Sequence, residues 1–167
     1  MAEKDILWGT KVKHKGIFDF KELYRILYEW FQSEDYNLGE KSYKESVGAG
    51  GSKQVEIEWE AYRNISDYFR FTIKVGWLIL GMTETEVEID GVKQKMNKGQ
   101  LELSIKSVLV KDYESRWETK PFIKFLRTLY DKYLIPARIE NYEGKLLGEM
   151  DELVAQVKSF LSLQGRK

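Results

Sequence analysis

Histidine and cysteine, which supply many catalytic groups and metal ligands, are almost absent from this sequence. His14 is the single histidine among 167 residues, and there is no cysteine. A thiolate nucleophile, a Cys-based metal site and a site built on two imidazoles are therefore excluded. His14 could act as a general base or as a polar group that fixes a ligand in a cavity. The alternative is a histidine at a strand edge, or in the core with its hydrogen bonds satisfied.

Charged residues alternate with other residues along several segments, and each series has two interpretations. Lys11, Lys13 and Lys15 could contact phosphate groups, or they could protect a solvated edge strand. The glutamates at 56, 58 and 60 and at 84, 86 and 88 could bind a hard cation, or they could simply face water. The sequence GAGGSK, residues 48–53, lacks the spacing of a phosphate-binding loop and joins two strand patterns, so it predicts a hairpin turn.

No pattern predicts a nucleophile–base pair, a nucleotide-binding fingerprint or a set of metal ligands. We therefore expect no catalytic residue, no metal and no cofactor, and we favour a protein that is not an enzyme. The 27 basic and 27 acidic residues give a formal net charge of +0, which argues against a nucleic-acid partner held by the whole domain. The N-terminal MAEKD lacks the apolar region of a signal peptide, which predicts a cytoplasmic protein.

The elements that position these residues are predicted from hydrophobic periodicity. The predicted strands and hairpin arms cover residues 6–15, 36–47, 54–62, 68–82, 85–96 and 101–110. Asp90-Gly91 is the expected hairpin turn. The predicted helices cover residues 18–33, with Asp19 as N-cap, 119–135 and 137–163. No internal repeat or linker interrupts this order, so residues 1–167 are expected to form a single domain.

The stretch VGWLILGM, residues 75–82, carries no charge although 32% of the chain is charged. It is far shorter than the ~20 apolar residues of a spanning helix, so no transmembrane segment is expected. In a strand, the odd-numbered residues share one face, while Leu78, Leu80 and Met82 make the other face apolar beyond Gly76. We expect this second face to be covered by the chain itself, for example by residues 6–8, by a homodimer or protein partner, or by lipid.

The order strand, helix, antiparallel meander and C-terminal helical segment predicts an α+β fold. We expect an antiparallel meander sheet of about six strands packed against one N-terminal helix and a long C-terminal helical segment. This order, over nearly the whole chain, resembles the helix-grip arrangement of the START and Bet v 1-like ligand-binding proteins. The resemblance implies a cavity between the sheet and the long helix that admits an apolar ligand.

These observations support the hypothesis of a non-catalytic binding domain, whose hydrophobic ligand or apolar peptide lies between the sheet and the C-terminal helix. The ligand would be an apolar small molecule or a lipid. One alternative is a protein-interaction or scaffold domain acting through an apolar sheet face or as a homodimer, with Leu78, Leu80 and Met82 at the interface. Another is a cavity enzyme of the cyclase or hydrolase type. The candidate ligand-binding residues are His14, Trp59, Tyr62, Phe71, Trp77 and Ile79.

Overall fold

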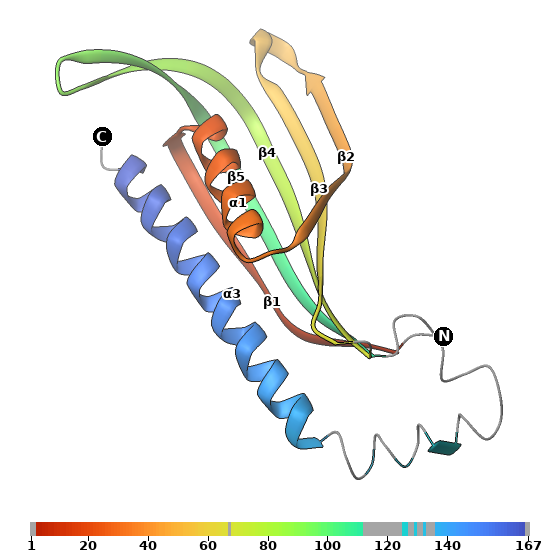
Figure 1. Cartoon of the computed structure of the whole chain (residues 1–167). Helices are drawn as coiled ribbons and strands as arrows, with labels where there is room; N and C mark the ends of the chain where they lie inside the picture. Colours follow the sequence, from red (N-terminus) through yellow and green to blue (C-terminus); the bar gives the residue numbers. More distant parts are fainter. Residues whose placement is uncertain are drawn as a thin grey trace.

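The computed structural model describes residues 3–66, 68–111 and 136–165, together with residues 125, 126, 129 and 132. Its centre is a five-stranded antiparallel sheet with the strand order β1-β5-β4-β3-β2. The strands are β1 (Glu3–Phe18), β2 (Asn37–Val47), β3 (Lys53–Asn64), β4 (Phe69–Ile89) and β5 (Val92–Lys111). Helices α1 (Phe20–Ser33) and α3 (Pro136–Gly165) lie on the same face of this sheet (Figure 1). The α+β class and the antiparallel sheet expected from the sequence are confirmed.

The number of strands differs from the expected six, because two pairs of predicted segments are continuous strands. Residues 68–82 and the first arm of the 85–96 hairpin both belong to β4, and the second arm and residues 101–110 both belong to β5. The register between β4 and β5 shifts between Leu80 and Thr83, at a bulge that contains Gly81 with φ +61°. The hydrophobic pattern breaks at this bulge, so the sequence predicts the end of a strand where the strand in fact continues.

The hairpin that joins β4 to β5 turns at Asp90 and Gly91, as predicted. Their φ values are 51° and 80°, and two consecutive positive values are what a type I′ turn requires. The register places Glu86 opposite Lys95 and Glu88 opposite Lys93. Opposite charges on facing strands stabilise this long, two-stranded extension of the sheet.

Helix α1 begins where the sequence predicts, and side chains from two places cap its N-terminus. The carboxylate of Asp19 accepts a hydrogen bond from the Glu22 amide at 3.2 Å, and Asn97 Oδ1 on β5 accepts one from the Phe20 amide at 3.1 Å. The helix buries one apolar stripe against the sheet, made by Leu23, Leu27, Trp30 and Phe31. The local cap therefore starts the helix, and Asn97 fixes its position relative to the sheet.

Helix α3 corresponds to the predicted helix over residues 137–163. Its 30 residues span about 45 Å at 1.5 Å per residue, so the helix is long enough to run along the sheet. Its buried stripe is made by Leu146, Met150, Leu153, Val157 and Leu161. The predicted helix over residues 119–135 lies almost entirely outside the described residues.

Candidate functional site

The sheet has a covered face, which contacts α1 and α3, and an open face on the other side. Four of the predicted ligand-binding residues, Trp59, Phe71, Trp77 and Ile79, lie on the covered face and are between 0% and 2% exposed. Alternation along β3 and β4 puts them there, as the sequence indicates. They belong to one core cluster with the buried stripes of both helices.

Aromatic rings fill the space between α1 and the sheet. The ring centroids of Tyr24 and Trp59 are 4.8 Å apart, those of Trp59 and Trp77 are 5.2 Å apart, and those of Phe20 and Trp77 are 5.8 Å apart. All three pairs are edge-to-face, an arrangement that favours aromatic packing. The contacts occupy most of the surface that these rings could offer to a ligand.

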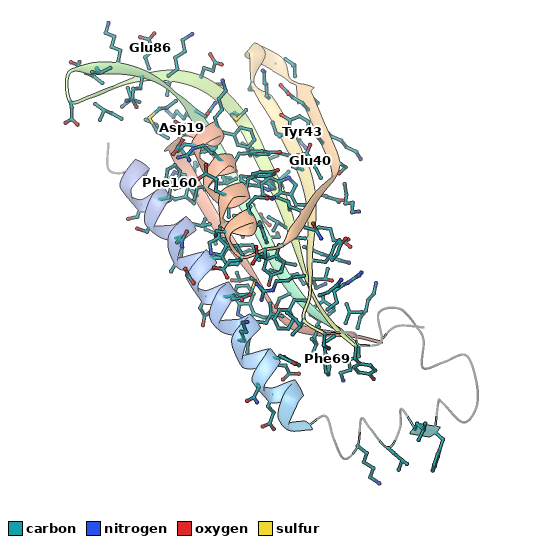
Figure 2. All side chains as sticks on the ribbon, viewed as in Figure 1. Asp19, Glu40, Tyr43, Phe69, Glu86 and Phe160 are labelled. Atoms are coloured by element: carbon teal, nitrogen blue, oxygen red, sulfur yellow. The ribbon has the colours of Figure 1, made fainter. Side chains whose placement is uncertain are left out.

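Glu40, on the α1 side of β2, lies at the edge of this aromatic cluster and hydrogen-bonds to two of its rings (Figure 2). One of its carboxylate oxygens accepts hydrogen bonds from the Tyr24 hydroxyl at 2.7 Å and from Trp59 Nε1 at 3.1 Å. Burial, with the hydrogen bond to Glu40 as a second cause, raises the pKa of Tyr24 to about 12. The phenol therefore stays protonated and keeps donating to Glu40 across the physiological pH range.

The two predicted polar ligand residues do not join this cluster. His14 Nε2 lies 3.0 Å from the carbonyl oxygen of Ile17, and its ring meets Phe18 edge-on at the β1 edge. Tyr62 follows buried Ala61 on β3 and so lies on the open face, where the Arg70 guanidinium stacks over its ring at 4.4 Å. The six predicted residues are therefore distributed over both faces and one edge of the sheet.

A polar clamp between the sheet and α3 was not anticipated from the sequence. Arg63 Nη2 on β3 donates to Glu149 Oε1 on α3 at 2.7 Å, and the Tyr36 hydroxyl donates to Glu149 Oε2 at 2.8 Å. Arg63 Nη1 also donates to the carbonyl of Glu34 at 2.6 Å, and the guanidinium lies over the Tyr36 ring. Burial and the neighbouring Glu149 carboxylate raise the pKa of Tyr36. The members are 86 and 113 positions apart in sequence, so no local spacing connects them.

The predicted interface residues of β4 separate at the bulge. Leu78 and Leu80 lie on the open face, and Leu80 is 39% exposed. Met82 instead packs against the core cluster of the covered face. The extra residue at Gly81 reverses the alternation of side chains beyond Leu80. Gly76, where we expected the changeover, causes no shift of register.

We expected the chain itself to cover this apolar segment on its second face, but the described residues leave Leu80 partly exposed. Ile6 lies opposite Val108 on β5 and is 64% exposed, and Trp8 packs against the core cluster of the covered face. Ile6 and Trp8 therefore do not cover Leu80. A partly exposed leucine in the middle of a sheet face leaves apolar surface accessible to another molecule.

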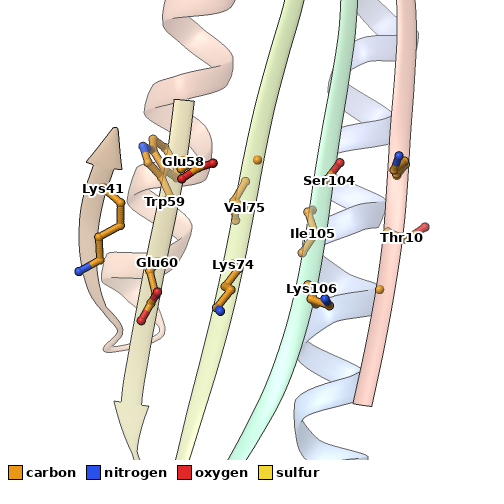
Figure 3. Close-up of a pocket in the computed structure, with 13 residues that line it drawn as sticks. Thr10, Lys41, Glu58, Trp59, Glu60, Lys74, Val75, Ser104, Ile105 and Lys106 are labelled. Atoms are coloured by element: carbon orange, nitrogen blue, oxygen red, sulfur yellow. The ribbon is translucent and has the colours of Figure 1, made fainter. Parts of the chain in front are cut away.

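A shallow trough of about 630 Å³ crosses the open face beside these leucines, as Figure 3 shows from the side away from the helices. Its floor is low because Gly9, Gly76 and Ser104 bring almost no side-chain volume to three neighbouring strands. The charged residues that line it are Lys11, Lys41, Glu58, Glu60, Lys74 and Lys106. The trough thus has small residues at its floor and charges of both signs around it.

The charges of the open face are arranged in columns that follow the strands. We call Lys11, Lys13 and Lys15 on β1 the basic column, and the outward glutamates 56, 58 and 60 on β3 the acidic column. Between them run β5 and β4, the latter with Gly76, Leu78 and Leu80 in its outward positions. A cross-strand ion pair joins Lys11 Nζ to Glu102 Oε1 at 3.1 Å.

Neither a metal centre nor a membrane-spanning helix is found in the described part of the chain. No group of three or more His, Cys, Asp or Glu side chains in residues 3–66, 68–111 and 136–165 could hold a metal ion. Among the helices formed by these residues, none combines the length and the apolar character needed to cross a bilayer.

The described residues define an α+β protein whose antiparallel sheet carries helices on one face. No protein-family model matches the chain, and no curated protein matches it. A solved structure of an uncharacterised protein from Rhizobium leguminosarum is similar over 97% of this chain and 98% of the other, with 10% identity and a TM-score of 0.28. A TM-score this low does not establish a shared fold.

Proposed function

We propose that this protein is a non-catalytic interaction domain that binds a protein partner through the open face of its sheet. One observation carries the proposal: helices α1 and α3 pack on the same face, while Leu78 and exposed Leu80 lie on the other. An antiparallel sheet with one solvated face normally shows polar residues there. Apolar residues in the middle of that face are better explained by a surface that is covered in the functional state.

The chemistry of the open face suits a protein more than a small molecule. Its centre combines small and apolar side chains of β4 with Gln100 and Glu102 of β5, and charged side chains of both signs surround it. An apolar centre with a polar rim is the usual anatomy of a protein interface. The trough is also shallow, whereas drug-sized ligands are usually enclosed on most sides.

Photo-crosslinking can test this proposal in cells that naturally make the protein. A photoreactive phenylalanine analogue replaces Leu80 on the open face, and a matched control carries it at Glu152, an exposed position on α3. We expect a discrete protein adduct from position 80 that position 152 does not give. The same adduct should be lost when Leu78→Lys is added, because a charge would then occupy the apolar centre. Equal crosslinking from both positions would contradict the proposal.

A second candidate is the apolar ligand between the sheet and α3, as in the helix-grip arrangement. The order of elements supports it, and so does Trp77 Nε1, which is buried and has no hydrogen-bond partner in the described structure. A ligand with an acceptor atom could satisfy that donor, but α3 or α1 would have to move to admit it. Native mass spectrometry of the purified protein tests this: a reproducible apolar adduct supports the ligand, and the bare chain mass argues against it.

A further inference from the structure

We propose that the partner of the open face is a second copy of this chain, so that two sheets pack face to face. This inference rests on the proposed function and assigns its partner. It comes from the order of the charge columns across the sheet, which makes the open face complementary to itself. A closed pair of this kind needs a two-fold axis, because each copy must present the same patch to the other.

Most of the charge in the two columns is unpaired within one chain. Among the described residues, Lys11 pairs with Glu102, whereas Lys13 and Lys15 have no anionic partner. The acidic column likewise has no ion pair to a described cation; Glu56 accepts only an amide hydrogen bond from Gln54 at 3.0 Å. Unpaired charges of opposite sign therefore flank the small and apolar residues of β4 on both sides.

The strand order determines which two-fold axis suits these columns. In the order β1-β5-β4-β3-β2, the boundary between β5 and β4 lies midway between β1 and β3. A two-fold axis along this boundary, parallel to the strands, brings each β1 opposite β3 of the second copy. The basic column then faces the acidic column twice. An axis across the strands would place each column against its own copy, with repulsion on both sides.

The residue register makes the pairing specific. Lys11 lies in one row across the sheet with Ser104, Gly76 and Glu58, and Lys13 lies in the next row with Glu102, Leu78 and Glu56. Rotation about the axis keeps each row opposite the same row of the second copy.

The rotation therefore brings Lys11 to the partner's Glu58 and Lys13 to the partner's Glu56. Gly9 falls opposite the partner's Glu60, and Lys106 lies beside it. The glycine leaves room for that carboxylate. The same rotation places Lys106 opposite the partner's Lys74, so two ammonium groups and one carboxylate meet in this row.

The open face is large enough for a stable dimer. From Arg70 to Leu80 the strands run about 33 Å at 3.3 Å per residue, and the four strands that face one another, β1, β5, β4 and β3, are about 19 Å wide at 4.8 Å spacing. The product is about 630 Å² for each copy, which is at the lower end of the range for specific interfaces. Sheets that pack face to face commonly keep their strands within about 30° of each other, so the proposed axis gives an ordinary packing angle.

Charge reversal tests the proposal without touching the core. One variant carries Lys11→Glu and Lys13→Glu, and a second carries Glu56→Lys and Glu58→Lys. Sedimentation velocity measures the mass of each alone and of their equimolar mixture. We expect the wild type to sediment as a dimer of the 19.7 kDa chain. Each variant alone should dissociate, with a dimer Kd raised about tenfold or more because like charges then face each other.

The mixture provides the decisive observation. The two variants carry complementary reversals, so they should form a heterodimer with the wild-type Kd, which also shows that both variants are folded. A control with Lys21→Glu and Lys158→Glu, on the exposed sides of α1 and α3, should remain a dimer. A monomeric wild type, variants that dimerise like the wild type, or a mixture that stays monomeric would each overturn the inference.

The outcome separates this inference from the proposed function. If the wild type is monomeric but position 80 still crosslinks to a different protein, the interaction domain stands and the second copy is wrong. If the wild type is monomeric and position 80 gives no specific adduct, both proposals fail.

Discussion

The two faces of the same sheet differ most clearly at two adjacent residues of β4. Ile79 points to the covered face and is fully buried, whereas Leu80 points to the open face and is 39% exposed. The two side chains have the same number of carbon atoms and follow one another on one strand. Their exposure therefore differs because of what covers each face. Helices α1 and α3 cover the face of Ile79, and none of the described chain covers Leu80. The hydrophobicity of the two side chains alone does not predict which of them is buried.

Polar groups show the same contrast between the faces. On the covered face, the Glu149 carboxylate accepts hydrogen bonds from Arg63 and Tyr36. Without these partners, the buried charge would destabilise the fold. On the open face, charged side chains remain in water, where leaving them without a partner costs little. The covered face thus has the features of a surface that stabilises the fold, and the open face has those of a surface available for binding.

The largest predicted effect compares truncation of the two adjacent side chains. Ile79→Ala should lower the free energy of unfolding by about 2–5 kcal/mol, because it leaves a cavity among buried neighbours. Leu80→Ala should change it by less than about 0.5 kcal/mol in the monomer, as is usual for a surface site. Urea unfolding at a protein concentration too low for association measures both values. A loss of several kcal/mol for Leu80→Ala would show that the open face is covered within the chain.

The second prediction concerns the clamp that joins α3 to the covered face. Arg63→Met should lower the free energy of unfolding by about 2 kcal/mol, because it leaves the Glu149 carboxylate largely buried without its cation. Hydrogen exchange should become faster in α3 around Glu149.

A second substitution checks that the two residues act together. Glu149→Gln added to Arg63→Met should cost much less than Glu149→Gln alone, since the shared interaction is already gone. Additive losses would mean that the two residues contribute independently, and that the clamp is not what holds α3.

The covered face was more predictable from the sequence than the open face. Alternation identified Trp59, Phe71, Trp77 and Ile79 as one buried set, because burial on one face has a strict period along a strand. Asp19 and the Asp90-Gly91 turn were also correct, since caps and tight turns depend on neighbouring residues. These features depend on residues that are close in sequence, so they can be predicted from the sequence.

The candidate site could not be predicted to the same extent. The bulge at Gly81 moved Met82 to the covered face, and nothing in the sequence distinguished Gly81 from Gly76 as the site of the bulge. The sequence showed that Lys11 and Glu58 each belong to an alternating series of charged residues. It did not show that they lie in one row across the sheet, because that depends on the strand order. The Arg63–Glu149 pair requires the docking of α3. These relations are tertiary, so only the folded chain reveals them.

The third prediction concerns the outer side of α3, which contacts neither face of the sheet. Gly144→Ala should raise the free energy of unfolding by about 1 kcal/mol, because alanine loses less backbone freedom than glycine in a helix. The added Cβ would meet nothing within 4 Å, so it brings no clash. Thermal unfolding measures the gain, and Gly148→Ala, equally free of contacts, should give a similar value. A loss in both variants would show that this side of α3 is packed against another part of the chain.

The smallest predicted effect tests where the covered face ends. Because burial and Glu40 raise the pKa of Tyr24 to about 12, the unfolded chain loses this proton from about pH 10 while the folded chain still holds it. The contribution of Tyr24 to stability is therefore complete below pH 10 and decreases as the pH rises toward 12. Tyr24→Phe should make the alkaline decrease in the free energy of unfolding less steep, measured by urea unfolding from pH 8 upward. Tyr36→Phe should act in the same direction, since its pKa is also raised by burial and Glu149. If Tyr24→Phe leaves the slope unchanged while Tyr36→Phe reduces it, Tyr24 is solvated, and the covered face ends between α1 and Trp59.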